Sequence, residues 1–438
     1  MNRVLSLICF IFISIASEAQ VMSLQQCIDT ALAHNIDVRQ KYLLMQSSEV
    51  DWHQSRSNIL PNLGGVVYHG FSHGKNIVPS SNGYVNQDLS YANYQLNSSI
   101  TVFNGGNLQN GIKQYASAYE AAKMEWQQSK DKLVLDVILQ YLTVLDDEEQ
   151  IESAKKQVEI SQRQLERYQL LDKQGAIKPS DVSDLKGQLM NEQLIVLNNQ
   201  NILESARLAL AQLMNRPYSR DLEPEKINID EFLTAYPKSA DEVYQTSLQQ
   251  FSLVKAVELR SKQYNYAVKS ARGLLYPNLF IDGGLNTRYS SNQKDITNVK
   301  VPYNSQLGNN MATFAEVGIS IPIFNRSIYR NRVKQANIVY KNSQLVEEST
   351  KLQLQQSIDK AYLDMTNAFQ KYNLLLEQVA AYTESFNAAQ TRFNAGVGTS
   401  VDYLTAKDRL DQANFNLIAA RYDFVLRKKI LDYYSGSK

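Results

Sequence analysis

Side chains able to do chemistry are few in this chain, and the histidines are the first to weigh. All 4 histidines lie in its first half, and His69 and His73 flank the residues Gly-Phe-Ser. On an alternating strand these two side chains share a face, as the ligands of a metal site would. Because no cysteine or carboxylate stands close to them in sequence, we interpret both as loop histidines and predict no bound metal.

Carboxylates are far more numerous, but no catalytic motif surrounds them. We interpret the acidic run Asp146–Glu149 as a charged exterior patch of a helix rather than as an acid/base pair. The chain has no G-x-S-x-G, H-E-x-x-H, C-x-x-C or phosphate-binding glycine loop. Its 45 basic residues balance 44 acidic ones, which argues against a nucleic-acid surface. We therefore predict a protein that is not an enzyme, carries no cofactor and binds no nucleic acid.

Two further aspartates, Asp181 and Asp402, stand at matching places 221 residues apart. The residues Thr399–Asp402 have the order of a capping box, in which the threonine accepts from the first helical turn and the aspartate reaches back. Pro179 stands where the first residue of the helix that contains Asp181 is expected. From the residues alone, helix capping accounts for both aspartates.

These matching places belong to a tandem repeat that covers both halves of the chain. A helical segment ends at Leu60–Leu63 (Leu-Pro-Asn-Leu) in the first half and at Tyr276–Leu279 (Tyr-Pro-Asn-Leu) in the second. Each is followed by alternating polar and apolar residues, which close on Phe103–Asn104 and on Phe324–Asn325. From there, matching residues of the two halves stay a constant 221 positions apart as far as the two aspartates. This constant spacing indicates an internal duplication.

The segments that carry the aspartates are two long helical hairpins. Neither 106–174 nor 327–395 contains a proline, so each predicts a single helix of about 100 Å. Apolar residues in these helices and in the helices that follow step by four and three, the seam of a coiled coil, so each pair forms an antiparallel hairpin. In the first hairpin the seam residues are Ala154, Val158, Ser161, Leu165, Tyr168, Val182, Leu185, Leu189, Val196, Leu203, Ala206 and Leu210. In the second they are Leu375, Val379, Tyr382, Phe386, Ala389, Phe393, Tyr403, Ala406, Leu410, Ala413, Leu417, Ala420 and Phe424.

Before each hairpin, the sequence predicts strands with one apolar and one polar face. The segments 92–102, 279–288 and 310–323 all alternate in this way. The pattern is typical of an outer-membrane β-barrel with a wet interior, although an ordinary sheet with one solvated face has the same periodicity. We favour the barrel because the rest of the chain offers no globular core for a sheet to cover. The two strand hairpins of one chain supply four strands, which are too few to close a barrel. Eight strands leave an interior filled by side chains, so a conduit needs three or more copies.

The turns at the hairpin tips carry a second expectation. Gly175 and Gly396 end long helices and are predicted to adopt the left-handed conformation. This accounts for one glycine in each tip, but not for Gly398 or for the apolar residues Ile177 and Val397 on an exposed turn. We therefore expect both tips to contact a partner protein. The residues of this contact are Gly175, Ala176, Ile177, Gly396, Val397 and Gly398.

The first residues are typical of a secretory signal peptide. Asn2-Arg3 precedes an apolar run from Val4 to Ala16, and the residues after it resemble a cleavage site. Removal of residues 1–20 leaves Cys27 as the lone cysteine, which we predict to be a packing residue outside any disulfide. No later apolar run is long enough for a transmembrane helix.

The chain as a whole resembles the TolC-like outer membrane efflux proteins after its signal peptide. The order, duplication and spacing of four stretches carry the resemblance: Ser23–Ala31, Leu60–Leu63, Val102–Gly106 and Arg392–Leu404. It implies a mainly α fold with β, in which tandem helical hairpins form an α-barrel and four strands per chain enter a trimeric, twelve-stranded outer-membrane β-barrel. It also implies a homotrimeric exit duct in the outer membrane of a Gram-negative bacterium. Such a duct contacts outer membrane lipid, extends into the periplasm, and joins a periplasmic adaptor and an inner-membrane transporter.

The resemblance also divides the chain and gives the aspartates a second interpretation. Residues 21–216 and 238–438 are then the two efflux-protein repeats, and 217–237 is a linker, exposed by its composition and placed by the family in an equatorial belt. Asp181 and Asp402 are expected to shape the periplasmic mouth, where Thr405 stands in place of a second carboxylate and weakens the constriction. The alternative is a periplasmic coiled-coil scaffold or adaptor that does not enter the membrane. The sequence does not indicate the exported cargo.

Overall fold

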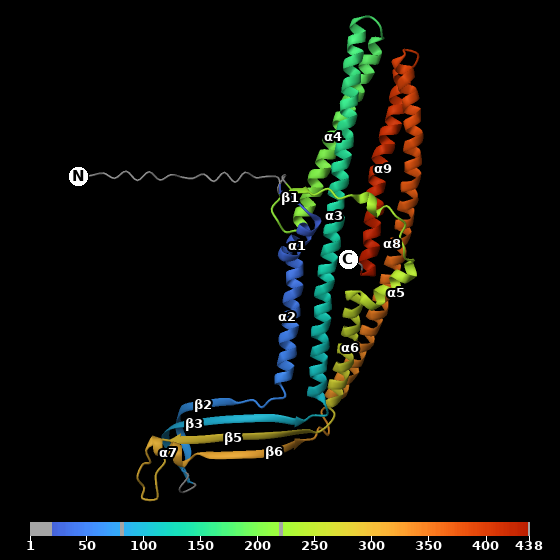
Figure 1. Ribbon diagram of the computed structural model, residues 1–438. Helices are drawn as coiled ribbons and strands as arrows, with labels where there is room; N and C mark the ends of the chain where they lie inside the picture. Colours follow the sequence, from blue (N-terminus) through green and yellow to red (C-terminus); the bar gives the residue numbers. More distant parts are fainter. Residues whose placement is uncertain (1–19, 79–82, 219–221, 437–438) are drawn as a thin grey trace, which may run out of the picture. The chain divides into compact units, whose positions relative to one another are not determined.

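The computed structural model describes residues 20–78, 83–218 and 222–436 (Figure 1). The predicted signal peptide lies outside these residues, apart from its last position, Gln20. The chain divides into two compact units: unit 1 is mainly helical, and unit 2 contains the main sheet. Unit 1 comprises Met1–Tyr42, Glu125–Val254 and Lys351–Lys438, and unit 2 comprises Leu43–Met124 and Lys255–Thr350.

Long helices make up most of unit 1, and four of them run on into unit 2. Those four are α2 (Ile36–Ser57), α3 (Asn107–Lys173), α6 (Ser252–Gly273) and α8 (Ile328–Asn394). The elements that lie wholly in unit 1 are α1 (Leu24–His34), α4 (Pro179–Leu213), α5 (Ala240–Gln250), α9 (Ser400–Ser435), the 3₁₀ turn η1 (Ile229–Phe232), β1 (Gln20–Met22) and β4 (Leu222–Pro224).

The two long helices confirm the tandem repeat at the level of structure. Helices α3 and α8 are each 67 residues long and begin and end 221 positions apart. Both predicted seams are confirmed, because every seam residue of the two hairpins is buried or half-buried. Aromatic and aliphatic side chains on this spacing hold α3 against α4 and α8 against α9, as the contact of Phe369 with Phe424 illustrates.

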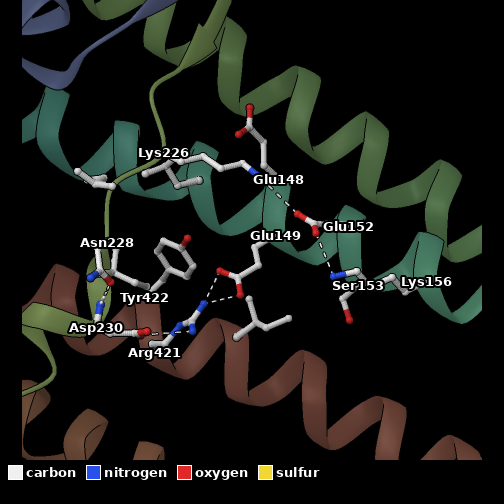
Figure 2. Close-up of a pocket in the computed structure, with 14 residues that line it drawn as sticks. Glu148, Glu149, Glu152, Ser153, Lys156, Lys226, Asn228, Asp230, Arg421 and Tyr422 are labelled. Atoms are coloured by element: carbon white, nitrogen blue, oxygen red, sulfur yellow. Dashed lines mark hydrogen bonds and ion pairs between the residues drawn. The ribbon is translucent and has the colours of Figure 1, made fainter.

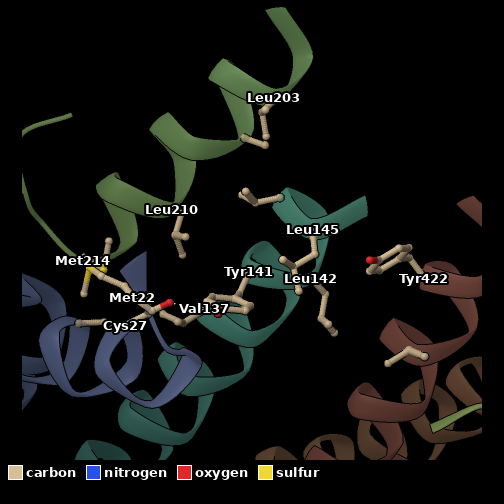
Figure 3. Close-up of a cluster of buried hydrophobic side chains, with 14 of the residues drawn as sticks. Met22, Cys27, Val137, Tyr141, Leu142, Leu145, Leu203, Leu210, Met214 and Tyr422 are labelled. Atoms are coloured by element: carbon tan, nitrogen blue, oxygen red, sulfur yellow. Dashed lines mark hydrogen bonds between the residues drawn. The ribbon is translucent and has the colours of Figure 1, made fainter. Parts of the chain in front are cut away.

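The largest apolar core of unit 1 joins α1, α3, α4 and the C-terminal half of α9 (Figure 3). Tyr141 on α3 is almost fully buried there, and its hydroxyl donates to the carbonyl oxygens of Met22 at 3.1 Å and of Glu225 at 2.7 Å. Cys27 is fully buried in the same core, which confirms the packing role predicted for it. Burial raises the pKa of its thiol to about 11, so the side chain stays protonated and unreactive at neutral pH.

The segment predicted to be an exposed linker is partly built into this core. Residues 222–224 form β4, which pairs in parallel with β1, and Ile229 in η1 is buried in the apolar core. Phe232 and Leu233 also pack against it. The composition was misleading because three apolar residues among many charged ones are enough to anchor this short segment.

Unit 2 contains an antiparallel sheet in the order β2-β3-β5-β6 (Figure 1). Its strands are β2 (Gly64–Val78), β3 (Gly83–Phe103), β5 (Asn278–Ser290) and β6 (Ala312–Ser320). The register places Tyr94 opposite Thr287, and Leu96 opposite Leu285, so the apolar sides of the predicted strands share one face of the sheet. The last strand ends before the predicted Ile323, because Pro322 cannot continue the ladder.

The turns that lead from the sheet into α3 and α8 have the same backbone in both repeats. Gly105 and Gly106 have φ of 65° and 78°, and the matching Arg326 and Ser327 have φ of 54° and 62°. This left-handed region suits glycine and strains other residues. The turn is therefore imposed by the surrounding strands and helices, even where the second repeat has no glycine.

The prediction for the histidines is partly wrong. Both His69 and His73 lie on strand β2, not in a loop, and the Nδ1 atom of His73 lies 2.5 Å from Oδ1 of Asp88 on β3. The carboxylate comes from fifteen positions away in sequence, across a hairpin, so local sequence did not indicate it. No group of three or more possible metal ligands among His, Cys, Asp and Glu is present in the described part of the chain. Within those residues, no helix is long and apolar enough to cross a membrane.

Candidate functional site at the helix tips

The first hairpin tip is a short turn that follows the end of α3. Gly175 has φ of 71°, and the amide of Ala176 donates to the carbonyl of Leu171 at 3.0 Å. Helix α4 then begins at Pro179 without a side-chain cap. Both Gly175 and Ala176 are exposed, whereas Ile177 is half-buried against a small apolar cluster. The expectation of an exposed Ile177 is therefore wrong.

The second tip has the same turn and one extra constraint. Gly396 has φ of 71°, and the amides of Val397 and Gly398 both donate to the carbonyl of Arg392 at 3.1 Å. A Cβ atom on Gly398 would stand 3.0 Å from the amide nitrogen of Phe393. Close packing thus explains this second glycine, which the sequence analysis explained only by contact with a partner protein. Val397 remains 79% exposed.

An apolar cluster behind the two tips joins the hairpins. Its rings stack in the order Tyr168, Phe393, Tyr403, with centroids 4.7 Å and 4.8 Å apart. The hydroxyl of Tyr168 on α3 donates to the carbonyl of Phe393 on α8 at 3.2 Å. A polar contact lies beside the stack, where Ser400 Oγ donates to Asp184 Oδ2 at 3.0 Å. The two tips of one chain are therefore fixed to each other.

The structure places the predicted mouth residues in different surroundings. Asp402 is exposed in the first turn of α9, and its amide donates to Thr399 Oγ1 at 3.1 Å. Its carboxylate accepts from the same hydroxyl at 2.7 Å, rather than from the backbone as a full capping box requires. Asp181 is half-buried in the first turn of α4, and Thr405 is exposed one turn along α9. Asp402 and Thr405 are therefore neighbours on α9, whereas Asp181 belongs to α4.

A buried charge network just inside the tips was missed from the sequence. Lys407 on α9 is only 1% exposed, and its Nζ donates at 2.6 Å both to Glu192 on α4 and to Asp411. Glu192 also accepts from Ser161 on α3 at 2.9 Å and from Gln188 at 3.0 Å. Burial lowers the pKa of Lys407, but the two carboxylates raise it more, so the pKa ends above its ordinary value. The lysine therefore stays charged inside the helical interface.

The seam spacing contained a signal for this network. Glu192 stands between Leu189 and Val196 at steps of three and four, and Lys407 stands between Tyr403 and Leu410 at steps of four and three. Both positions fit the seam spacing, and in α9 Lys407 lies beside the predicted seam residue Ala406 and is the more deeply buried of the two. A charge on such a seam indicates a paired, buried group. The position that matches Lys407 in the first repeat is Lys186, which is exposed.

A second charged region surrounds a cavity of about 400 Å³ between α3, α9 and residues 226–230 (Figure 2). Arg421 on α9 forms ion pairs with Glu149 and, at 3.5 Å, with Asp230. Lys226 pairs with Glu152 at 3.4 Å. These pairs hold the linker and the second hairpin against α3.

The interpretation of Asp146–Glu149 as an exterior patch is wrong. Consecutive residues point about 100° apart around a helix, so four of them cannot all face solvent on a packed helix. Asp147 is only 9% exposed, and its Oδ2 atom has no hydrogen-bond partner among the described residues. Burial, and then the neighbouring charges of Asp146 and Glu148, raise its pKa to about 7. Glu148 pairs with Arg207 on α4 at 2.9 Å.

Comparison with known proteins gives this fold its family. The family model described as "Outer membrane efflux protein" matches residues 27–216 and 243–436. The chain is 24% identical over 431 residues to the outer membrane protein TolC of Salmonella enteritidis, covering 96% of this chain and 83% of that protein. TolC of Escherichia coli K12 is 23% identical over 421 residues, covering 94% of this chain and 82% of that protein.

Solved structures agree on the fold. The chain superposes on CusC with a TM-score of 0.81 at 18% identity, covering 95% of this chain and 92% of that one. It superposes on the CmeC outer membrane channel of Campylobacter jejuni with a TM-score of 0.80 at 16% identity, covering 94% of this chain and 86% of that one. With both repeats matched by the family model and the predicted hairpins and sheet in place, the chain belongs to the outer membrane efflux protein family, a family of channel proteins of the Gram-negative outer membrane.

Proposed function

We propose that three copies of this protein form the outer membrane duct of a tripartite efflux system, and that the duct itself catalyses nothing. The four-stranded sheet is the observation that carries this proposal. Within the described residues, β2 and β6 each pair along one side only, which leaves two open sheet edges. Open edges beside large exposed apolar side chains are a liability in water, so other copies must cover them.

The two faces of the sheet support a barrel with lipid outside and water inside. Phe71, Val317 and Ile319 lie on the apolar face and are 68%, 70% and 66% exposed in the single chain. Asn93 and Gln95 lie on the opposite face of β3. Three copies supply twelve strands, and a barrel wider than about eight strands leaves room for a wet passage. Passive conduction through such a passage needs no catalytic group.

The helix tips are proposed to contact a periplasmic adaptor protein, through which the duct meets an inner-membrane transporter. Val397 supports this most directly, because a single large apolar side chain stands exposed on a bare turn. Gly175, Ala176 and Gly396 extend the same exposed surface. Ile177 and Gly398 contribute by shaping the turns from within. Asp402, with Thr405, is proposed to line the mouth of the assembled duct, and Asp181 to stand beside it.

Assembly and extraction test the proposed duct. The protein purified in detergent should have the native mass of a trimer, and envelopes should release it with detergent but not with salt or high pH. A monodisperse monomer in detergent would contradict the trimer. Release by salt alone would instead favour a periplasmic scaffold that does not enter the membrane.

A further inference from the structure

The connection between β5 and β6 contains a small, well-built finger, residues 293–301. The amide of Val301 donates to the carbonyl of Gln293 at 3.0 Å, and the amide of Asp295 donates to the carbonyl of Val299 at 2.9 Å. Asp295 Oδ1 then accepts from the amides of Thr297 and Val299, both at 2.9 Å, which closes the turn. These bonds give the finger a fixed shape.

The base of the finger is fastened to the sheet by α7 (Tyr303–Asn309). Gln306 is 1% exposed; its side chain accepts from the amide of Ser290 at 2.9 Å and donates to the carbonyl of Val301 at 2.8 Å. Tyr303 packs on Tyr289 with ring centroids 4.4 Å apart, and its hydroxyl is hydrogen-bonded to that of Tyr94. By the strand register, Tyr94 and Tyr289 lie on the apolar face of the sheet.

This attachment places the finger at a membrane boundary if the apolar face meets lipid. The end of β2 at Val78, the start of β3 at Gly83 and the connection from β5 to β6 lie at the end of the sheet opposite the strand ends that join the long helices. In the proposed duct this is the outer end. Tyrosine rings at that level suit the interface between hydrocarbon and water.

The charged side chains of the finger indicate which kind of ligand it binds. Lys294 and Lys300 are direct cross-strand partners, and both are exposed. Like charges in this position repel each other. Asp295 stands beside Lys294, but its carboxylate is committed to the turn. Ile296 and Val299 at the tip are fully and 60% exposed, so the finger combines two cations with apolar side chains.

We propose that the finger binds the phosphate groups of lipids in the outer leaflet of the membrane. Paired lysines attract anionic headgroups, while Ile296 and Val299 enter the apolar region just beneath them. The lipid phosphates then remove the repulsion between Lys294 and Lys300. This inference rests on the proposed duct, because it requires the apolar face of the sheet to lie in the membrane.

The test is lipid retention by the intact, detergent-purified trimer. The trimer is incubated either with lipid A that carries two phosphates or with the dephosphorylated form of that lipid. Native mass measurement then gives the number of lipid molecules bound to each trimer. We expect wild-type protein to retain the phosphorylated lipid, and the double variant K294Q/K300Q to bind it about 10- to 30-fold more weakly, with the difference shrinking at high salt. The matched control K334Q/K341Q removes two exposed lysines from α8 and should bind as wild type does.

Several outcomes would overturn the inference while leaving the duct intact. A trimer that retains both lipids equally has no phosphate site, and equal binding by K294Q/K300Q and the control places that site elsewhere. Displacement of the lipid by millimolar inorganic phosphate would show a site for the free ion. Absence of a trimer at the outset would instead contradict the proposed function itself.

Discussion

At the scale of single residues, Lys407 is the charge whose removal should cost most. It is buried with Glu192 and Asp411, so Lys407→Ala leaves two carboxylates without their cation inside the helical interface. We expect a loss of about 3–5 kcal/mol in unfolding free energy. The matched change Lys186→Ala, at the exposed equivalent in the first repeat, should cost less than about 0.5 kcal/mol.

Thermal unfolding followed by helical circular dichroism in detergent would measure this difference. A double variant, K407M/E192M, should recover part of the loss, because it removes both members of the main pair. Equal and small effects of Lys407→Ala and Lys186→Ala would show that the buried network contributes little to stability.

Asp147 should make stability depend on pH in the direction opposite to most aspartates. Its folded pKa is about 7, above the ordinary value of 3.8, so the folded protein binds the proton more tightly than the unfolded chain does. Stability therefore falls as pH rises from about 4 to 7, and the penalty is complete above about 7. We expect Asp147→Asn to stabilise the protein by on the order of 2 kcal/mol at pH 8 and hardly at all at pH 4. Unfolding measured at both pH values checks this, and an equal effect at the two would refute it.

At the scale of elements, the turns before α3 and α8 have the same left-handed backbone, which predicts opposite effects of adding and removing a side chain there. Ser327 holds a left-handed backbone that glycine adopts freely, so Ser327→Gly should stabilise the protein by about 0.5–1 kcal/mol. Gly105→Ala should do the opposite and cost more than about 2 kcal/mol, because its Cβ would stand 2.5 Å from the carbonyl of Gly273. Chemical denaturation of both variants measures the pair. A loss of stability in Ser327→Gly would mean that the serine side chain has a role of its own.

The hairpin tips are elements whose surface should matter for export but not for assembly. Val397→Glu puts a charge on the exposed turn and should abolish export while the trimer still forms. Val397→Ile keeps an apolar surface and is expected to export normally. Gly398 is a poorer choice, because any side chain there crowds the backbone at Phe393. Normal export by Val397→Glu would remove Val397 from the adaptor contact.

At the scale of the whole molecule, the two repeats should not fold apart. Strand β3 of the first repeat pairs with β5 of the second, and Tyr422 of the second lies in the core built around Tyr141 of the first. A repeat alone would have a two-stranded hairpin, which is marginally stable in water. Cutting the chain between Pro237 and Lys238 should therefore yield halves that are degraded when made singly and that recover a detergent-stable trimer when made together. Stable accumulation of either half alone would show independent repeats.

The sequence by itself determined the features that are set locally. Helix lengths followed from the absence of proline, the seams from steps of three and four, and the left-handed turns at Gly175 and Gly396 from glycine after a long helix. Strand faces followed from alternation. Each of these patterns arises within a few consecutive residues, so the chain displays it without any partner.

The tertiary structure decided which residues meet across long separations in the chain. It paired Lys407 with Glu192, packed Ile177 behind the tip and set Asp147 into the interior. It also fixed Gly398 by close packing and docked part of the linker on the core. The local sequence does not show whether a charged residue is exposed or is buried with a partner. It also does not show whether a glycine forms a turn or allows a close contact. In both cases the answer depends on which residue lies opposite in the fold. For Lys407 the opposite residue is 215 positions away, which no local pattern records.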